Sequence, residues 1–541
     1  MMFSSLMDFF SIALIVPLLS LIQKKSIEES QFAGILNSLN LQVDIQSIIY
    51  LFITFIVFKG IFSILIVFLQ ASYIVQLQNY FRENIFLNYL HNNFEDTFKQ
   101  HSSITYRNIV TEVSEFISSY MSPFLTLISN LILFVFMTTL VFMVDFKSAI
   151  FIFVTFFICF FLLRLFLSSP LKKLGFERLE KDTEYFKVMA DAFEFIKDIK
   201  FFNLQKVYVK KFLKVLYRQL RINRTRAILT HLPKVFFEIL FVSIFSVFLL
   251  YNYQNEQILI IIGVYAAAAL RVFPAINQVS AAYQKIKFSA STFKIIEENL
   301  EKENYFETED KKLDYKDNIS INSLNFKYKI NNENTLEDIN VNFSRKDKIG
   351  IFGESGSGKS TLLNLILGFL EPSDTNCIKS NNISIYDDKK SWRENISYVP
   401  QRVVILDQSI KSNIVLSNPF IEFDEKKYKD AVNKSGLNKV IEKLDNKDET
   451  LLGENGDKIS MGEKQRIGIA RAIYRDAKVI IMDEMSNFLD QENKNQIVKN
   501  IHEHFNDRII IMVSHDKEVF KYSDKIYELK GKKLNLYKKK N

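Results

Sequence analysis

A glycine-rich segment in the second half of the chain constrains its fold more than any other feature. The segment reads Gly353-Glu354-Ser355-Gly356-Ser357-Gly358-Lys359-Ser360-Thr361. It follows a strand-like run at 348–352 and precedes a helix-like run at 362–367. This context predicts a P-loop, in which backbone N–H groups and a helix N-terminus bind phosphate. The chain is therefore predicted to contain an α/β domain that binds ATP or GTP.

Two residues of this loop predict chemistry as well as binding. The Lys359 ammonium can reach the β- and γ-phosphates, and the Ser360 hydroxyl can ligate Mg²⁺. The flanking strand and helix favour a nucleotide site over the alternative, a glycine turn that only connects them.

Apolar residues are concentrated in the first half of the chain. Of its 541 residues, 48% are hydrophobic, and nearly all long apolar runs precede residue 290. The net charge of +8 suits a membrane protein that faces the cytoplasm, and no compact basic patch with interleaved aromatic residues indicates nucleic-acid binding. The two cysteines, Cys159 and Cys377, lie in the apolar and polar halves respectively and predict no disulfide.

Six apolar segments are long enough to cross a bilayer, which requires about 20 residues. The segments are 2–22, 47–73, 122–144, 147–167, 233–252 and 257–282. The long connections after the second and fourth are basic (Arg178 is one of their cations), whereas the 253–256 loop has no Lys or Arg. The positive-inside rule places these connections and the C-terminal domain in the cytoplasm.

The fold class follows from these segments. We expect an all-α polytopic membrane domain of six transmembrane helices at 1–300, then a charged linker at 301–316, then an α/β P-loop ATPase domain at 317–541. The first apolar segment starts almost at Met1, without the basic flank or cleavage site of a signal peptide. We expect the first helix of the natural protein to start upstream of Met1.

Two carboxylates end an apolar, strand-like run at 479–483. Asp483 is predicted to hold Mg²⁺ through water, and Glu484 to orient and polarise the attacking water. Gln401, at the end of Tyr398-Val-Pro-Gln, supplies an amide that can sense Mg²⁺ and the γ-phosphate.

Two further residues are candidates for direct nucleotide contact. His515 follows another apolar run, 509–513, and is predicted to contact the γ-phosphate; a purely structural histidine is the alternative. Tyr328, upstream of the P-loop, is predicted to stack on adenine, and a core tyrosine is the alternative.

A segment between these motifs points to one family. Ile459-Ser460-Met461-Gly462-Glu463-Lys464-Gln465-Arg466 resembles the signature of ATP-binding cassette (ABC) ATPases, Leu-Ser-Gly-Gly-Gln followed by Gln-Arg. The resemblance implies that Ser460, Gly462 and Glu463 contact nucleotide, with Ser460 and Gly462 reaching the γ-phosphate bound by the opposite subunit. Met461 and Glu463 depart from the family's Gly and Gln, so a working but altered site is expected.

Neighbouring segments extend the resemblance. Gly453-Glu-Asn-Gly456 is similar to a loop typical of ABC exporters, and Ser486-Asn-Phe-Leu-Asp490 resembles the D-loop. Six spans followed by one cassette resemble an exporter half-transporter. This implies a homodimer that uses ATP and Mg²⁺, with coupling helices near 92–105 and 198–212.

The spans resemble flippases of lipid-linked oligosaccharides in the stretches 8–17, 196–200 and 270–277. Lys59, Lys234 and Arg271 are the candidate substrate contacts, because a charge at membrane depth usually faces a cavity or a partner. Cations suit the pyrophosphate of a polyprenyl-linked sugar. The alternative is internal pairing, of Asp8 with Lys59 or Arg271 and of Lys234 with Glu238; for Lys234 this pairing or snorkelling is favoured.

The sequence therefore predicts an ATP-driven flippase or exporter in the bacterial inner membrane, in contact with membrane lipid and an amphiphilic glycolipid. An exporter of peptides or hydrophobic small molecules is the second interpretation. A third, an ATP-gated regulator without transport, is disfavoured by the intact Glu484 and His515.

Overall fold

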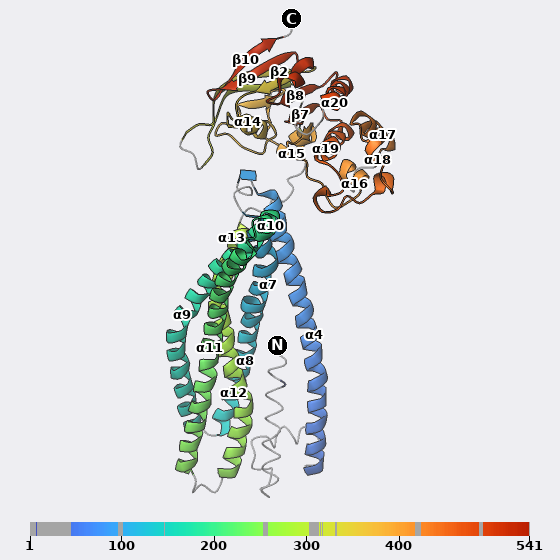
Figure 1. Ribbon diagram of the computed structural model, residues 1–541. Coiled ribbons are helices and arrows are strands. Elements are labelled where there is room, and N and C mark those ends of the chain that lie inside the picture. Colours follow the sequence, from blue (N-terminus) through green and yellow to red (C-terminus); the bar gives the residue numbers. More distant parts are fainter. Residues whose placement is uncertain are drawn as a thin grey trace. The chain divides into compact units, whose positions relative to one another are not determined.

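The computed structural model (Figure 1) describes most of the chain. The described residues are 7, 45–92, 94–95, 101–144, 146–252, 258–301, 313, 315, 318–329, 333–416, 423–485 and 491–539. The first predicted span except Met7, most of the predicted linker and the segment similar to a D-loop lie outside these residues.

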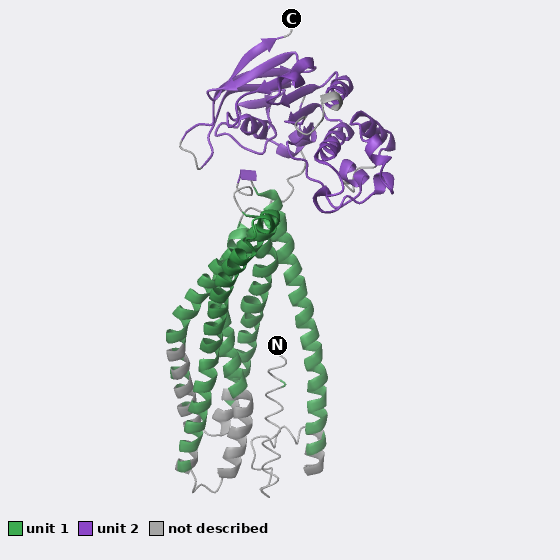
Figure 2. Ribbon diagram, in the orientation of Figure 1, with its two compact units in different colours: residues 1–92, 97–305 green, residues 93–96, 306–541 purple. Residues whose placement is uncertain are grey.

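The chain forms two compact units (Figure 2). Unit 1 comprises Met1–Asn92 and Thr97–Tyr305, and unit 2 comprises Asn93–Asp96 and Phe306–Asn541. The main boundary between the two units lies between residues 305 and 306. It falls inside the segment that the sequence predicts to be a linker.

Unit 1 is built of long helices. The longest are α4 (Ile45–His91), α9 (Phe146–Glu194) and α11 (Gln205–Asn252), with 47, 49 and 48 residues. At 1.5 Å per residue each is ~70 Å long, more than twice the ~30 Å of a bilayer's hydrocarbon core. The other helices of unit 1 among the described residues are α6 (Ser102–Tyr106), α7 (Val113–Phe116), α8 (Ser122–Val144), α10 (Ile196–Phe201), α12 (Ile258–Phe288) and α13 (Ala290–Glu301). Two π-helical stretches, η2 (Arg107–Glu112) and η3 (Ile117–Met121), flank α7.

Three stretches of the described helices are long and apolar enough to cross a membrane. They are Phe52–His91, Ser102–Phe136 and Gln205–Val247, and they contain most of the second, third and fifth predicted spans. The fourth and sixth predicted spans fall within α9 and α12 and are not among these three. The number of six spans therefore stays a prediction.

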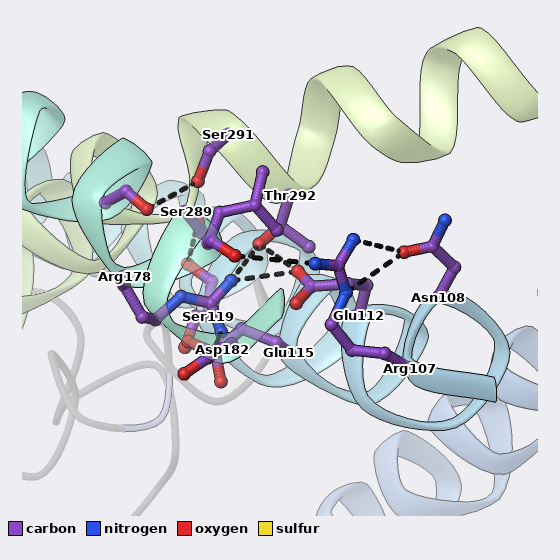
Figure 3. Close-up of polar contacts among 12 residues, drawn as sticks. Arg107, Asn108, Glu112, Glu115, Ser119, Arg178, Asp182, Ser289, Ser291 and Thr292 are labelled. Atoms are coloured by element: carbon purple, nitrogen blue, oxygen red, sulfur yellow. Dashed lines mark hydrogen bonds and ion pairs between the residues drawn. The ribbon is translucent and has the colours of Figure 1, made fainter. Parts of the chain in front are cut away.

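A buried polar cluster joins three helical segments of unit 1 (Figure 3). One terminal nitrogen of Arg178, in α9, donates to Glu112 Oε2 and to the Thr292 hydroxyl, each at 2.8 Å. The Thr292 hydroxyl donates to the same carboxylate oxygen at 2.8 Å. Arg178 also pairs with Asp182 at 3.4 Å. The Glu112 side chain is 0% exposed and that of Arg178 is 8% exposed, so water does not screen this ion pair.

The same junction is closely packed. A Cβ atom at Gly175 would lie 1.9 Å from the backbone oxygen of Phe288, so the close approach of α9 requires glycine there. The Ser291 hydroxyl donates to the Gly175 carbonyl, and the Ser289 hydroxyl donates to the Ser119 carbonyl. The turn between α12 and α13 is thereby tied to two other helices.

Unit 2 contains two sheets. The smaller is antiparallel, in the order β2-β1-β4-β5, from β1 (Asn318–Phe326), β2 (Leu336–Ser344), β4 (Ile378–Ser380) and β5 (Ile383–Ser384). The larger has the order β10-β9-β3-β8-β7-β6, from β3 (Lys348–Phe352), β6 (Ile396–Val399), β7 (Val479–Asp483), β8 (Ile509–Val513), β9 (Lys525–Lys530) and β10 (Lys533–Lys539). All neighbours in it are parallel except β9 and β10. Every residue of β3, β7 and β8 is buried, which explains why these strands are apolar apart from Lys348 at the start of β3 and Asp483 at the end of β7.

Helices surround these sheets. They are α14 (Lys359–Ile366), α15 (Lys389–Glu394), α16 (Ile410–Val415), α17 (Glu425–Lys434), α18 (Asn438–Ile441), α19 (Met461–Arg475), α20 (Gln491–His504) and the short 3₁₀ helices η4 (Lys447–Glu449), η5 (Glu454–Gly456) and η6 (Lys517–Tyr522). The short segment 93–96 belongs to unit 2, and in it the Phe94 ring stacks on Phe369 with centroids 5.0 Å apart. This segment lies within the first stretch predicted to carry a coupling helix, 92–105.

Candidate nucleotide site

The predicted nucleotide residues follow neighbouring parallel strands of the larger sheet. The P-loop follows β3, Glu484 follows β7, and His515 comes two residues after β8. Gln401 comes two residues after β6. Because the carboxyl ends of parallel strands share one edge of a sheet, these residues gather at the edge where α/β proteins bind ligands.

The backbone of the P-loop is shaped for phosphate. Gly356 and Gly358 have φ of 81° and 105°, which a residue with a Cβ rarely adopts. The Ser357 hydroxyl is buried and has no hydrogen-bond partner among the described residues. A bound phosphate oxygen would satisfy this hydroxyl, so the loop fits the ATP that the sequence predicts.

The Lys359 side chain lies over the same loop. It is 9% exposed, and its Nζ donates to the backbone oxygens of Gly353 and Glu354 at 2.8 and 2.9 Å. A buried ammonium bound only by neutral carbonyls is available to an anion. Of the other predicted loop residues, Ser355 and Ser360 are exposed and Thr361 is buried.

Two predicted residues, Gln401 and His515, lie beside the carboxylate of a third, Glu484. Gln401 Nε2 donates to Glu484 Oε2 at 2.8 Å, and His515 Nδ1 lies 3.5 Å from Glu484 Oε1. The backbone of Glu484 has φ of 47°, a left-handed conformation that is uncommon for a residue with a side chain. Such strain is found most often at functional sites. No sequence motif around Glu484 indicates this conformation.

Asp483 lies at the end of β7 beside Glu484. Burial, and secondly the negative charge of Glu484, raise the pKa of Asp483 to about 6, although the positive charge of Lys359 opposes the rise. A carboxylate in this position needs positive charge to stay ionised. The described residues contain no group of three or more His, Cys, Asp or Glu that could hold a metal.

Tyr328 contacts the P-loop helix through its hydroxyl. Its oxygen lies 3.0 Å from the Thr361 hydroxyl, and its ring packs edge-to-face on Phe326 with centroids 5.1 Å apart. Tyr328 is therefore near the nucleotide edge and also packs against the core, so both interpretations of this residue are compatible with its position.

The signature-like residues start helix α19. Ser460 is the N-cap of α19, and Gly462 and Glu463 lie in its first turn. Among the hydrogen bonds described for this structure, none links these residues to the P-loop of the same chain.

The three candidate substrate cations lie on three different helices of unit 1. Lys59 is half-buried on α4, Lys234 is exposed on α11, and Arg271 is on α12, where its side chain is not described. Asp8, the suggested partner of Lys59 or Arg271, lies outside the described residues. The described contacts do not bring these cations together.

The class of the ATPase domain is given by comparison with known families. Residues 336–487 match the family model described as ABC transporter. This range contains the P-loop, Gln401, the signature-like segment and Glu484. Unit 2 therefore carries an ABC-type ATPase domain, which binds and hydrolyses ATP.

The fold of the whole chain resembles a solved exporter. A structure described as a bacterial Atm1-family ABC exporter with ATP bound superposes with a TM-score of 0.84, covering 98% of this chain and 93% of that chain at 16% identity. The chain thus has the fold of a helical membrane domain joined to an ABC ATPase domain.

Two sequence relatives align with part of the chain. The chain is 37% identical over 212 residues to "ABC transporter ATM1" of Plasmodium falciparum, and 34% identical over 216 residues to "Alpha-hemolysin translocation ATP-binding protein HlyB" of Escherichia coli. These matches cover 39% and 40% of this chain but only 20% and 30% of the relatives.

Proposed function

We propose that the chain is one half of a homodimeric ABC exporter, in which ATP hydrolysis drives an amphiphilic cargo across the bacterial inner membrane. The observation that carries this proposal is the convergence of Gln401 and His515 on Glu484, beside the P-loop and the buried Asp483. The exporter fold and the apolar helices of unit 1 support the membrane part of the proposal.

Each residue of the proposed site has a role in ATP hydrolysis. Lys359 exchanges its two loop carbonyls for the β- and γ-phosphates, which its charge stabilises as the bond breaks. Glu484, oriented by Gln401, accepts a hydrogen bond from the attacking water, and His515 contacts the γ-phosphate. Ser360, Gln401 and Asp483 would hold Mg²⁺, which would neutralise phosphate charge when bound.

The proposed homodimer would give each signature segment a nucleotide bound by a second copy. Ser460 and Gly462 start α19, and no described contact links them to the P-loop of their own chain. In the proposed assembly they contact the nucleotide bound by a second copy. Two copies related by a two-fold axis complete two sites.

A lipid-linked oligosaccharide is the proposed cargo. Lys59 and Arg271 lie on predicted spans, where a charge costs about 2.5–3.5 kcal/mol unless it faces water, a partner or a ligand. The pyrophosphate of such a lipid would bind cations that line a cavity.

The cargo prediction concerns Arg271. In lipid nanodiscs, the wild-type ATPase rate should rise when a polyprenyl-pyrophosphate glycolipid is added, and Arg271→Ala should lose most of that rise while keeping the basal rate. Arg271→Lys should keep part of it, because the charge survives without the planar fork. Lys172→Ala, a control at an exposed cation of α9 beyond the predicted fourth span, should respond as wild type does. Full stimulation of folded Arg271→Ala would remove the reason for preferring this cargo.

Peptide or protein export is the second candidate. It is favoured by the relative named for translocation of alpha-hemolysin, although the match covers only 40% of this chain and 30% of that relative. Stimulation of the same nanodiscs by amphipathic peptides and not by the glycolipid would favour this candidate.

A further inference from the structure

The departure of Glu463 from the family's glutamine has a structural consequence. Glu463 Oε2 accepts hydrogen bonds from the Ser460 backbone N–H at 2.7 Å and from the Ser460 hydroxyl at 2.8 Å. The Glu463 backbone N–H faces the Ser460 hydroxyl oxygen at 3.4 Å, which completes a capping box at the start of α19. The Ser460 hydroxyl is therefore held by a carboxylate of its own chain.

A serine hydroxyl has a single proton to donate. While Ser460 donates it to Glu463, it cannot donate it to a phosphate. A carboxylate also holds this proton more strongly than a neutral amide oxygen does, because hydrogen bonds to an ionised acceptor are about twice as strong as neutral ones. Glutamine at position 463 would release the hydroxyl more readily.

The surroundings leave the Glu463 charge available for this bond. The ammonium of the next residue, Lys464, donates to the Asn455 carbonyl at 2.7 Å, in the loop before α19. No ion pair of Glu463 is found within the described part of the chain, and the Met461 side chain beside it is 44% exposed and apolar.

We propose that Glu463 is a positioning residue that competes with the γ-phosphate of ATP for the Ser460 hydroxyl. Through this competition it raises the ATP concentration at which the two cassettes close on nucleotide. The inference rests on the proposed homodimer, because the phosphate in question is bound by the second copy.

The experiment measures ATP hydrolysis by full-length homodimers in nanodiscs as a function of ATP concentration. Glu463→Gln should lower the apparent KM for ATP by about fivefold, the effect of about 1 kcal/mol, and change kcat less than twofold. In a Ser460→Ala background the same substitution should leave KM unchanged, since no hydroxyl remains to be released. A cap that only stabilises α19 would not show this dependence on Ser460. Glu425→Gln, the same change in the first turn of α17, is the matched control and should keep the wild-type KM.

The outcomes separate this inference from the proposed function. A wild-type homodimer that hydrolyses ATP, together with a Glu463→Gln variant of unchanged or higher KM, overturns the role of Glu463 alone. A folded wild-type protein without ATPase activity overturns both. If Glu463→Gln lowers the yield of folded protein, nucleotide retention in a Glu484→Gln background replaces turnover as the readout. Higher retention when Glu463→Gln is added to that background supports the competition, and equal or lower retention contradicts it.

Discussion

Glu484→Gln should reduce ATP turnover by about 10²- to 10⁴-fold, the usual contribution of a general base. The substituted glutamine keeps the shape of the side chain and can still bond to Gln401, but it lacks the charge that polarises water. Because ATP binding does not need that charge, a nucleotide-bound closed dimer should accumulate. Steady-state hydrolysis and the amount of nucleotide retained after gel filtration measure the two effects.

The control for this substitution is Glu503→Gln. Glu503 is an exposed carboxylate of α20 that lies 3.7 Å from Lys499, outside the nucleotide site. This variant should hydrolyse ATP at the wild-type rate. Near-normal turnover of Glu484→Gln would show that another group activates the water.

Glu112→Ala should destabilise unit 1 by about 3–5 kcal/mol, because it leaves Arg178 buried without its main partner. Arg178→Met should cost a similar amount by leaving Glu112 unpaired. The double variant Glu112→Leu/Arg178→Met should recover much of the loss, since apolar side chains of similar size need no partner. The yield of monodisperse protein and its thermal unfolding in lipid measure these changes.

An exposed ion pair of the same helix serves as the comparison. Glu180 is 72% exposed and lies 3.0 Å from Lys181, so Glu180→Ala should change stability by less than about 1 kcal/mol. If Arg178→Met proved as stable as wild type, or if the double variant were no better than either single one, the buried pair would not be holding these helices together.

The candidate nucleotide site of the ATPase half could be predicted from the sequence because its residues lie in short local motifs. The P-loop and Glu484 each follow a short buried strand and Asp483 ends one, and parallel strands of this kind bring their carboxyl ends to one edge of a sheet. The sequence did not indicate the backbone conformation of Glu484. The left-handed φ of Glu484 depends on the turn that follows β7, and glutamate carries no signal for it.

The sequence indicates two other features of the structure only weakly: the capping box of α19 and the burial of Arg178. Ser460 and Glu463 have the Ser-x-x-Glu spacing of a capping box, but the pattern was interpreted only as an altered signature. Arg178 was counted as one cation of a basic cytoplasmic connection. The structure buries it against Glu112 and Thr292, which are 66 and 114 residues away, and a contact at such separation leaves no local pattern.

The most direct test of the proposed exporter is whether one copy of the chain hydrolyses ATP alone or whether two copies are needed. Nanodiscs that hold one or two copies of the wild-type chain can be separated, their copy number established by native mass spectrometry, and their ATP hydrolysis measured per chain. If each site needs the P-loop of one copy and Ser460 of another, hydrolysis will be confined to discs with two copies. Hydrolysis at the same rate per chain in single-copy discs would contradict the account.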